Sequence, residues 1–534
     1  MKRSTLLDRP TADLIGFSWL VAAVAPLSAY GERSFSELAP FSAGDEQAAR
    51  SRAQRIAEVA ATLDPARLEA LRGLLRDVPD VRGALAGAAI GDVLTDPAFL
   101  QLRRFCATLA RVDSLVADSN QFELLCSTAI TAVRDALATG QRDDATSFYL
   151  ADAFDDRLAA ARQRRSDAHA EFQALRGREE RRIAAALERD DLGDEFIVMR
   201  ADVRGDLPAG VQVIREAPTY FLCRIQYDET TVTALQRRDA ADRSAAQAEE
   251  DVRARLSALV QERAAELTGA GAALGEIDVL AAAAAYAQRY RCTAPEIAEE
   301  PQLEFEQARF LPLEEELSLA GRAFTALDVQ LNGGAVLTGP NMGGKTVCLQ
   351  TCGFVALCCA YGLPAPATRA RAGLFDQIAW LGLGRDERVG GLLSSFAREV
   401  LALKEVFERA APRVLLLGDE FARTTTPHEG RALSIALLER LRERRTCALL
   451  ATHLGGVAAA SGARHFAVLG LRGMPPPSEG APLEQVLATL AASMDYRVAE
   501  VGEADSPTGD AIALADLLGL DREFIAAAHR AAGQ

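Results

Sequence analysis

The chain has 534 residues, of which 49% are hydrophobic, and it carries a formal net charge of −16. This length predicts about three or four domains, and the apolar content is ample for buried cores. Because proteins that grip duplex DNA usually present a basic face, the acidic balance disfavours this class of protein and leaves room only for a localised DNA surface.

The N-terminus and the cysteines indicate a cytoplasmic protein. An apolar stretch at 14–25 follows basic residues, as in a signal peptide, but Asp8 and Asp13 interrupt the basic flank. The stretch is too short to span a bilayer, so we expect a buried helix or strand. Nine cysteines, an odd number without a C-x-x-C pair, indicate a reducing compartment. For Cys348 and Cys352, which share a helix face, core packing is expected rather than a metal or redox pair.

Residues 1–300 are predicted to form a largely helical domain. From about 46 to 190 the sequence is rich in Ala, Leu, Arg and Glu at helical spacing, which predicts long helices. Short alternating runs separated by Gly and Pro predict a small β insert near 194–228. The residues from Thr231 to Leu267 predict one long amphipathic helix that returns from this insert.

A glycine-rich loop at 339–346 gives the strongest functional signal. It fits the pattern G-x-x-x-x-G-K-[ST], which binds phosphates, and it follows a strand-like run at 335–338. In this pattern backbone N–H groups point at the phosphates, Lys345 adds a charge near the β and γ oxygens, and Thr346 can place its hydroxyl on Mg²⁺. The apolar helix expected at 347–360 would aim its positive end at the same phosphates. Taken alone, the pattern also fits an ordinary glycine-rich turn.

The loop therefore predicts a nucleoside triphosphate site. Its expected binding residues are Gly339, Pro340, Asn341, Met342, Gly343, Gly344, Lys345 and Thr346.

Two further strand-like runs end in polar side chains. The run at 414–417 leads to Asp419, which is suited to hold Mg²⁺, and to Glu420, which is suited to deprotonate the attacking water. The run at 446–451 leads to His453, where a neutral imidazole could contact a γ-phosphate. Each feature alone also fits a polar cap at the end of a strand. Beside the phosphate loop, we interpret Thr346 and Asp419 as Mg²⁺ ligands and Glu420 and His453 as catalytic residues.

The segments GPNMGGKT, LLLGDEFARTTTPHEG and LLATHL together resemble the ATPase domain of the MutS family, the ABC-type ATPases known from DNA mismatch repair. The resemblance implies a mixed fold, in which an α-helical core and lever domain precedes an α/β P-loop ATPase domain of ABC type at 301–534. It also implies that ATP and Mg²⁺ are the cofactors. The specific motifs lie at 335–455, and weaker similarity extends over about residues 30–530.

The resemblance also implies a dimer. Ser394, with Ser395, Phe396 and Glu399, is similar to the family's signature segment, whose serine completes the nucleotide site of the other subunit. Ser394 is therefore expected to bind nucleotide in a homodimer, or in a heterodimer with a MutS-like paralogue. Without the flanking motifs, the two serines would fit an ordinary helix N-cap.

The chain departs from the family pattern in three places. Ala422 and Thr424 stand where the repair proteins usually carry glycines, so the turn after Glu420 is expected to be altered. By the resemblance, we also expect the mismatch-reading and connector domains to be missing from these 534 residues. The segment that corresponds to the family's two long clamp helices is expected to be short.

Two kinds of load fit such an ATPase. The first is a protein: the motif DEFARTTTPHEG on a shortened chain resembles the ATPase of the reactivating system for the adenosylcobalamin-dependent lysine 5,6-aminomutase. The second is duplex DNA, held by a mismatch-repair or recombination-related clamp. Basic runs at 162–165 and 176–182 are interleaved with acidic residues, which is more typical of solvated helix faces than of a DNA surface.

Overall fold

The computed structural model describes residues 1, 6–118, 121–122, 124–142, 146–189, 192–193, 195–340, 344–382, 395–408, 413–444, 446–471, 493–502, 512, 515–516 and 520–532. The chain divides into two compact units. The first comprises Met1–Asp77, Val112–Glu123 and Ala272–Gln534, and the second comprises Val78–Arg111 and Leu124–Gly271. The boundary expected at residue 300 does not coincide with this division, because the N-terminal helices share one hydrophobic core with the later sheets.

The first unit contains a six-stranded sheet with the strand order β13-β12-β7-β11-β10-β9. The strands from β12 to β9 are parallel neighbours, and β13 is antiparallel to β12. Strands β10 and β11 are buried along their whole length, and apart from Asp419 at the end of β10 their sequences are apolar, as is typical of central parallel strands. The bounds are β7 (Gly334–Thr338), β9 (Gln377–Gly382), β10 (Val414–Asp419), β11 (Cys447–Ala451), β12 (Arg464–Leu471) and β13 (Met494–Glu500).

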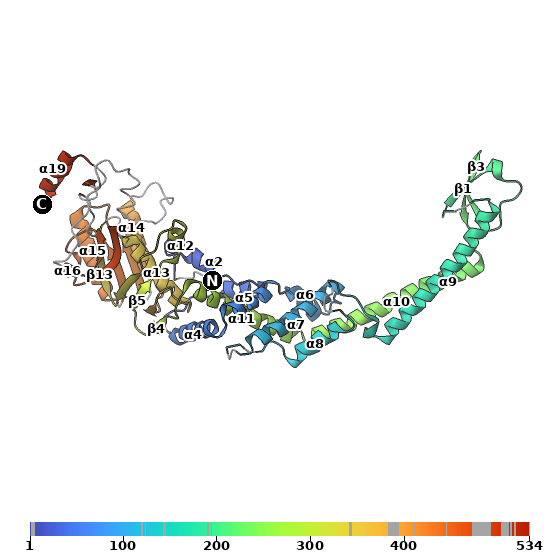
Figure 1. Cartoon of the computed structure of the whole chain (residues 1–534), viewed down its shortest axis with the longest axis horizontal. Helices are drawn as coiled ribbons and strands as arrows, with labels where there is room; N and C mark the ends of the chain where they lie inside the picture. Colours follow the sequence, from blue (N-terminus) through green and yellow to red (C-terminus); the bar gives the residue numbers. More distant parts are fainter. Residues whose placement is uncertain are drawn as a thin grey trace. The chain divides into compact units, whose positions relative to one another are not determined.

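Helices cover both faces of this sheet (Figure 1). Because side chains alternate along a strand, Leu415 and Leu417 pack toward α13, whereas Leu416 packs toward α14, α15 and α16. Helix α13 is buried on all sides, and its Cys348 and Cys352 are packed in the core as expected. The bounds are α13 (Lys345–Ala360), α14 (Ser395–Glu408), α15 (Pro427–Arg442) and α16 (Val457–Ser461).

The N-terminal stretch completes the face that carries α13. It forms α1 (Arg9–Leu14) and α2 (Phe17–Ala23), which confirms the expected buried helix. The backbone N–H of Ile378 in β9 donates to the carbonyl of Leu6 at 2.9 Å. Ile15 lies so close to α13 that a β-carbon on Gly353 would sit 2.5 Å from Ile15 Cγ2. A glycine at that position therefore allows the close packing of this segment.

A second sheet, with the order β4-β8-β5-β6, lies in the same unit. Its strand β6 precedes β7 by a short turn, and α12 precedes β6. The bounds are β4 (Glu296–Ala298), β5 (Leu303–Ala308), α12 (Leu311–Leu319), β6 (Leu327–Leu331) and β8 (Arg369–Gly373). This sheet joins the core beneath α13.

A buried carboxylate joins two helices of the first unit, α3 (Ala29–Glu37) and α11 (Ala264–Tyr290). Asp278 of α11 is fully buried and accepts hydrogen bonds from the N–H of Leu27 at 3.0 Å and from the N–H and hydroxyl of Ser28, both at 2.7 Å. These donors lie at the N-terminus of α3, where a negative charge is favourable. A β-carbon on Gly31 would lie 2.2 Å from Asp278 Oδ2, so the close approach requires a glycine.

Helix α11 is long and apolar enough to cross a membrane by length and composition, but 72% of its most apolar window is buried within the protein. Gln288 of α11 donates to the carbonyls of Ala60 and Leu63, at the end of α4 (Glu46–Thr62), and α5 (Pro65–Arg76) follows α4 in the chain. Burial of this kind fits a core helix.

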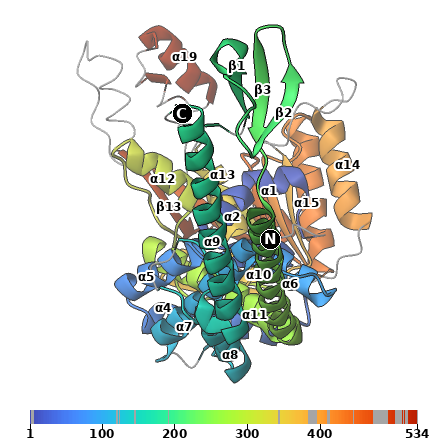
Figure 2. The ribbon, with the colours of Figure 1, turned by 90° about the vertical axis from the view of Figure 1, so that its right-hand side faces the viewer.

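The second unit is mainly helical. Its helices α9 and α10 have 31 and 34 residues and run side by side (Figures 1 and 2), so the segment expected to be short is instead long. Their sequences are polar with few apolar positions, which suits a pair of helices that bury one narrow stripe between them. The bounds are α6 (Arg82–Ala89), α7 (Asp96–Val116), α8 (Thr128–Ala138), α9 (Asp156–Ala186) and α10 (Glu229–Glu262).

A three-stranded antiparallel sheet connects α9 to α10, at the residues where a small β insert is expected. Its order is β1-β3-β2, with β1 (Glu195–Met199), β2 (Val211–Glu216) and β3 (Tyr220–Ile225). Phe196, Val198 and Cys223 pack on Ile183 at the end of α9. This small core fixes the sheet on the helix pair.

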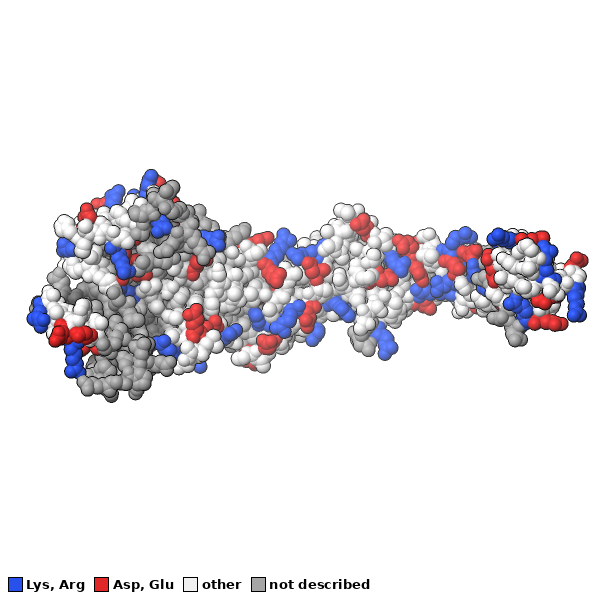
Figure 3. All heavy atoms as spheres, turned by 90° about the horizontal axis from the view of Figure 1, so that it is seen from above, with Lys and Arg blue, Asp and Glu red and all other residues white. Residues whose placement is uncertain are grey.

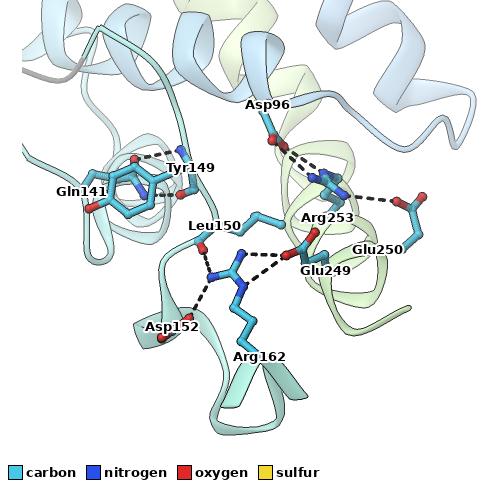
Figure 4. A network of polar contacts seen from close by, with 9 residues as sticks. All are labelled: Asp96, Gln141, Tyr149, Leu150, Asp152, Arg162, Glu249, Glu250 and Arg253. Carbon is cyan, nitrogen blue, oxygen red and sulfur yellow. Dashed lines mark hydrogen bonds and ion pairs between the residues drawn. The ribbon is translucent and has the colours of Figure 1, made fainter. Parts of the chain in front are cut away.

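Two arginines connect α9 and α10 with the segments around them (Figure 4). Arg162 of α9 donates to Glu249 of α10 at 2.9 Å, to Asp152 at 2.8 Å and to the carbonyl of Leu150. Arg253 of α10 donates to both carboxylate oxygens of Asp96 at 2.9 and 3.2 Å. Planar guanidinium groups suit such multiple contacts.

The surface of the second unit carries both signs of charge. In Figure 3 lysine and arginine side chains alternate with aspartate and glutamate over the face of this unit that is shown. Two basic residues of the run at 176–182 are paired within their own helix, Arg176 with Glu180 and Arg182 with Glu179. On the face that Figure 3 shows, the arrangement matches the solvated helix faces expected from the sequence.

We expect Arg162→Ala to lower the free energy of unfolding of the second unit by about 1–3 kcal/mol, because Glu249 and the carbonyl of Leu150 lose a charged donor. Urea unfolding of the whole chain, followed by circular dichroism, measures this. Arg164→Ala is the matched control, since Arg164 is exposed on the same helix. Equal effects of the two substitutions would contradict the role of the network.

Candidate functional site

The glycine-rich loop lies between β7 and α13, as the sequence predicts. Gly339 follows β7 with φ of 144°, and Gly344 precedes α13 with φ of 85°. Both values lie in the region that favours glycine. Asn341, Met342 and Gly343 lie outside the described residues. The first turn of α13 starts at Lys345, so its free N–H groups lie directly after the loop.

Lys345 is buried, and its ammonium group is directed back over the loop. Its Nζ donates to the carbonyls of Gly339 and Pro340, each at 3.0 Å, and lies 3.1 Å from Nε2 of His453. Burial lowers the pKa of Lys345, and the nearby carboxylates of Glu420 and Asp419 oppose this effect. The Lys345 side chain therefore lies directly over the residues that begin the loop.

Thr346 and Asp419 form the second pair of the site. The hydroxyl of Thr346 donates to Oδ2 of Asp419 at 2.8 Å. Asp419 is only 3% exposed, and burial raises its pKa, while the hydrogen bond from Thr346 acts in the opposite direction. A hydroxyl and a carboxylate at this distance present adjacent oxygen atoms, which are the ligands that Mg²⁺ prefers. The pair therefore fits one side of a Mg²⁺ site that phosphate oxygens and water would complete.

Glu420 and His453 are brought together at the same edge of the sheet. Oε1 of Glu420 lies 2.7 Å from Nε2 of His453, and Oε2 accepts from Nη1 of Arg423 at 2.8 Å. The carboxylate is mostly buried, whereas the His453 side chain is 41% exposed. His453 thus lies within hydrogen-bonding distance of both Lys345 and Glu420.

The structure therefore assembles five of the expected residues, Lys345, Thr346, Asp419, Glu420 and His453. Parallel register explains why, since Asp419 of β10 pairs with Ala451 of β11, which pairs with Leu337 of β7. Residues that follow these positions must then lie close together. Ser394, the expected contribution to a partner's site, lies outside the described residues.

A pocket of about 220 Å³ beside the loop was not foreseen from the sequence. It is lined largely by apolar side chains, among them Leu317, Phe324, Val347 and Tyr496, with the backbone of Gly344 at its edge. Phe324 precedes β6 and Tyr496 lies in β13, far apart in the sequence. The signal for this pocket in the sequence is one aromatic residue, Phe324, which lies shortly before β6. A flat heteroaromatic ring fits such a pocket next to a phosphate loop.

Residues 335–469 match the family described as MutS domain V. This segment is MutS-like. It contains β7, β10 and β11 and all five assembled site residues.

Curated relatives extend the likeness unevenly. The chain is 35% identical to the Endonuclease MutS2 of Carboxydothermus hydrogenoformans over 190 residues, which cover 35% of this chain and 23% of the relative. It is 33% identical to the Endonuclease MutS2 of Pelotomaculum thermopropionicum over 206 residues, covering 38% of this chain and 25% of that protein. It is 28% identical to the DNA mismatch repair protein MutS of Nitrobacter hamburgensis over 432 residues, 75% of this chain and 47% of the relative. The chain thus spans about half or less of the length of these relatives.

We expect Gly339→Ala to lower the free energy of unfolding of the first unit by about 1–3 kcal/mol more than Gly333→Ala does. The reason is that the β-carbon added at residue 339 would be placed too close to its neighbours. That atom would lie 3.0 Å from Val468 Cβ and 3.2 Å from the Val468 carbonyl. Gly333 has a similar φ of 152°, but a β-carbon there would have no heavy atom within 4 Å. Gly333→Ala therefore measures the backbone strain alone, whereas Gly339→Ala adds the steric clash. Thermal unfolding midpoints compare the two variants, and equal midpoints would show that the close contact with β12 is absent.

Proposed function

We propose that this chain is a MutS-like ATPase, in which ATP hydrolysis at the edge of the six-stranded sheet drives a conformational switch. The observation that carries the proposal is the convergence of Lys345, Thr346, Asp419, Glu420 and His453 at one edge of the sheet. A cation, an oxygen pair for a metal ion and a carboxylate next to an imidazole are the groups that phosphoryl transfer requires. The match of residues 335–469 to MutS domain V supports the same activity.

Each residue has a distinct proposed role. Lys345 neutralises the β and γ oxygens of ATP, and Thr346 with Asp419 holds Mg²⁺, which supplies charge neutralisation at the same phosphates when bound. Glu420 accepts a proton from the attacking water, and His453, between Glu420 and Lys345, contacts the γ-phosphate. Asn341, Met342, Gly343 and Gly344 would contribute backbone N–H donors, whereas Pro340 has no N–H to donate.

The apolar pocket beside Gly344 is proposed to hold the nucleobase. It opens next to the N-terminus of α13, so a nucleotide whose phosphates lie in the loop could extend its base between Phe324 and Tyr496. Stacking on aromatic rings supplies affinity without a charge. This placement accounts for a part of the nucleotide that the five polar residues do not contact.

The active form is proposed to be a cytoplasmic dimer, either of two copies or with a MutS-like paralogue. Ser394 would complete the partner's nucleotide site, as its resemblance to the family's signature segment suggests. ATP would then close two such domains on each other, and hydrolysis would release them.

For the load, duplex DNA held by a mismatch-repair or recombination-related clamp is the reading that the relatives favour. Two of them are described as endonucleases and one as a DNA mismatch repair protein. Helices α9 and α10 would each reach roughly 45–50 Å, at about 1.5 Å per residue, and carry a small sheet that could contact the load. Both α7 and α11 contain residues of the two units and could transmit the change.

One observation favours a protein load instead. The net charge is −16, and basic and acidic side chains alternate over the face of the second unit that is shown in Figure 3, which would leave few phosphates neutralised. A client such as the adenosylcobalamin-dependent lysine 5,6-aminomutase, opened so that damaged cobalamin can be exchanged, is the second candidate.

We expect Lys345→Ala to abolish ATP hydrolysis and Glu420→Gln to slow it by about 10²–10⁴-fold while ATP still binds. The isosteric glutamine keeps the size of the side chain but cannot accept the proton. Steady-state hydrolysis and nucleotide binding measure the two effects, and light scattering with ATP should show Glu420→Gln trapped as a dimer. Unchanged turnover in Lys345→Ala would contradict the assignment of the phosphate loop.

Hydrolysis by the purified chain with and without duplex DNA tests the load. If DNA is the load, stimulation should be strong at low salt and fall steeply at moderate salt, because each phosphate contact releases counterions. Lys345→Ala serves as the blank. Clear hydrolysis that is indifferent to DNA at both salt concentrations would argue for the protein client.

A further inference from the structure

The turn after β10 has an unusual backbone. Glu420 and Ala422 have φ values of 55° and 59°, the left-handed region that side chains with a β-carbon disfavour. Only five non-glycine residues of the described chain have a positive φ, and two of them are Glu420 and Ala422, with Phe421 between them. Because Ala422 carries a β-carbon in this region, the turn needs contacts that hold it in place.

One side chain from a different element supplies such a contact. Oε2 of Glu399, on α14, accepts a hydrogen bond from the N–H of Ala422 at 2.8 Å. Ala422 is only 2% exposed, so without Glu399 this N–H would be a buried donor that lacks an acceptor. Burial raises the pKa of Glu399, and the hydrogen bond from Ala422 opposes that rise.

Further contacts hold the rest of the turn by backbone atoms. The N–H of Glu420 donates to the carbonyl of Ala451 at 2.9 Å, and the N–H of Arg423 donates to the carbonyl of Glu420 at 3.1 Å. On the other side of Ala422, a β-carbon on Gly430 of α15 would lie 3.1 Å from the Ala422 carbonyl. Glu399 thus supplies a side-chain acceptor from α14 for a backbone N–H of the turn, beside these backbone contacts and the pairing of the Arg423 and Glu420 side chains.

The direction of the Glu420 side chain depends on this turn. Its Oε1 lies 2.7 Å from His453 Nε2, and a backbone that relaxed from φ of 55° to the ordinary negative range would swing the carboxylate away. We propose that Glu399 is a positioning residue for Glu420, holding the left-handed turn so that the carboxylate stays beside His453. The inference rests on the proposed ATPase function, and it assigns Glu399 a role that acts through the backbone of Ala422.

A matched pair of substitutions separates the hydrogen bond from packing. Glu399→Gln keeps the length and an oxygen that can accept from the Ala422 N–H, whereas Glu399→Met keeps the length without that oxygen. We expect kcat for ATP hydrolysis to fall about 10- to 100-fold in Glu399→Met, since small displacements of a reacting group have effects of that size. The KM for ATP should stay within about threefold, because Lys345, Thr346 and the base pocket are unchanged, and Glu399→Gln should stay within about threefold of the parent in both constants.

Relief of the strain provides the second measurement. Glycine adopts a positive φ without penalty, so Ala422→Gly in the Glu399→Met background should recover at least about threefold of the lost kcat. Glu405→Ala is the control, since Glu405 is exposed on the same helix. The kcat and KM values of all variants are compared at a temperature well below their thermal unfolding midpoints. If Glu399→Met does not fold, Glu399→Ala takes its place.

The outcomes separate this inference from the proposed function. Hydrolysis that Lys345→Ala abolishes but Glu399→Met leaves unchanged overturns the role of Glu399 alone. A loss that is shared by Glu399→Gln, or that Ala422→Gly does not restore, shows a structural role only and overturns the inference as well. Absence of hydrolysis in the parent chain overturns both. A selective loss of kcat in Glu399→Met with rescue by Ala422→Gly establishes the positioning role.

Discussion

The candidate site depends on the parallel pairing of three strands, β7, β11 and β10. Their carboxyl ends lie at one edge of the sheet, and the pairing continues for one residue beyond the strands, through hydrogen bonds from the N–H of Glu420 to Ala451 and from the N–H of Thr452 to Leu337. Any side chain that follows directly must therefore lie near the glycine-rich loop. A register shift of one residue would place Asp419 and Glu420 on opposite faces from those observed, because strand side chains alternate.

Charged groups of opposite sign lie close together at this edge of the sheet, and several of them are buried from solvent. Lys345 and Asp419 are both nearly buried, and burial shifts their pKa values toward the neutral forms, downward for the lysine and upward for the aspartate. The opposite charges of the neighbours and the hydrogen bond from Thr346 oppose these shifts only in part, since the pKa of Lys345 stays lowered and that of Asp419 stays raised. This arrangement suits the proposed ligand, a nucleoside triphosphate with Mg²⁺, because both would find partners already fixed by the fold.

The second unit differs in physical character. Its long helices α9 and α10 depend on ion pairs, of which those of Arg162 and Arg253 lie near the same end of the pair, and on a narrow apolar stripe. A helix pair of this kind can be stiff without a large core, which suits the transmission of movement better than binding by an extended apolar surface. The mixed charge of this unit is compatible with weak contacts to a DNA backbone or with contacts to a protein surface. The chain matches only part of the length of its relatives, so the DNA load and the protein load both stay proposals.

The sequence alone was sufficient for the local elements of the site. The strands β7, β10 and β11, the helix α13 and the residues Lys345, Thr346, Asp419, Glu420 and His453 could be predicted because glycine conformations, apolar runs and polar residues at strand ends are properties of short segments. The apolar pocket beside Gly344, the length of the α9 and α10 pair and the Glu399 contact could not be predicted. Phe324 and Tyr496, which line the pocket, are far apart in the sequence. Polar helices such as α9 and α10 show only a weak hydrophobic periodicity, which gives little information about their length. The sequence marked Ala422 as a departure, but only the tertiary structure shows a left-handed backbone held by a carboxylate from another helix, because such strain is maintained by contacts between distant segments and leaves no local pattern.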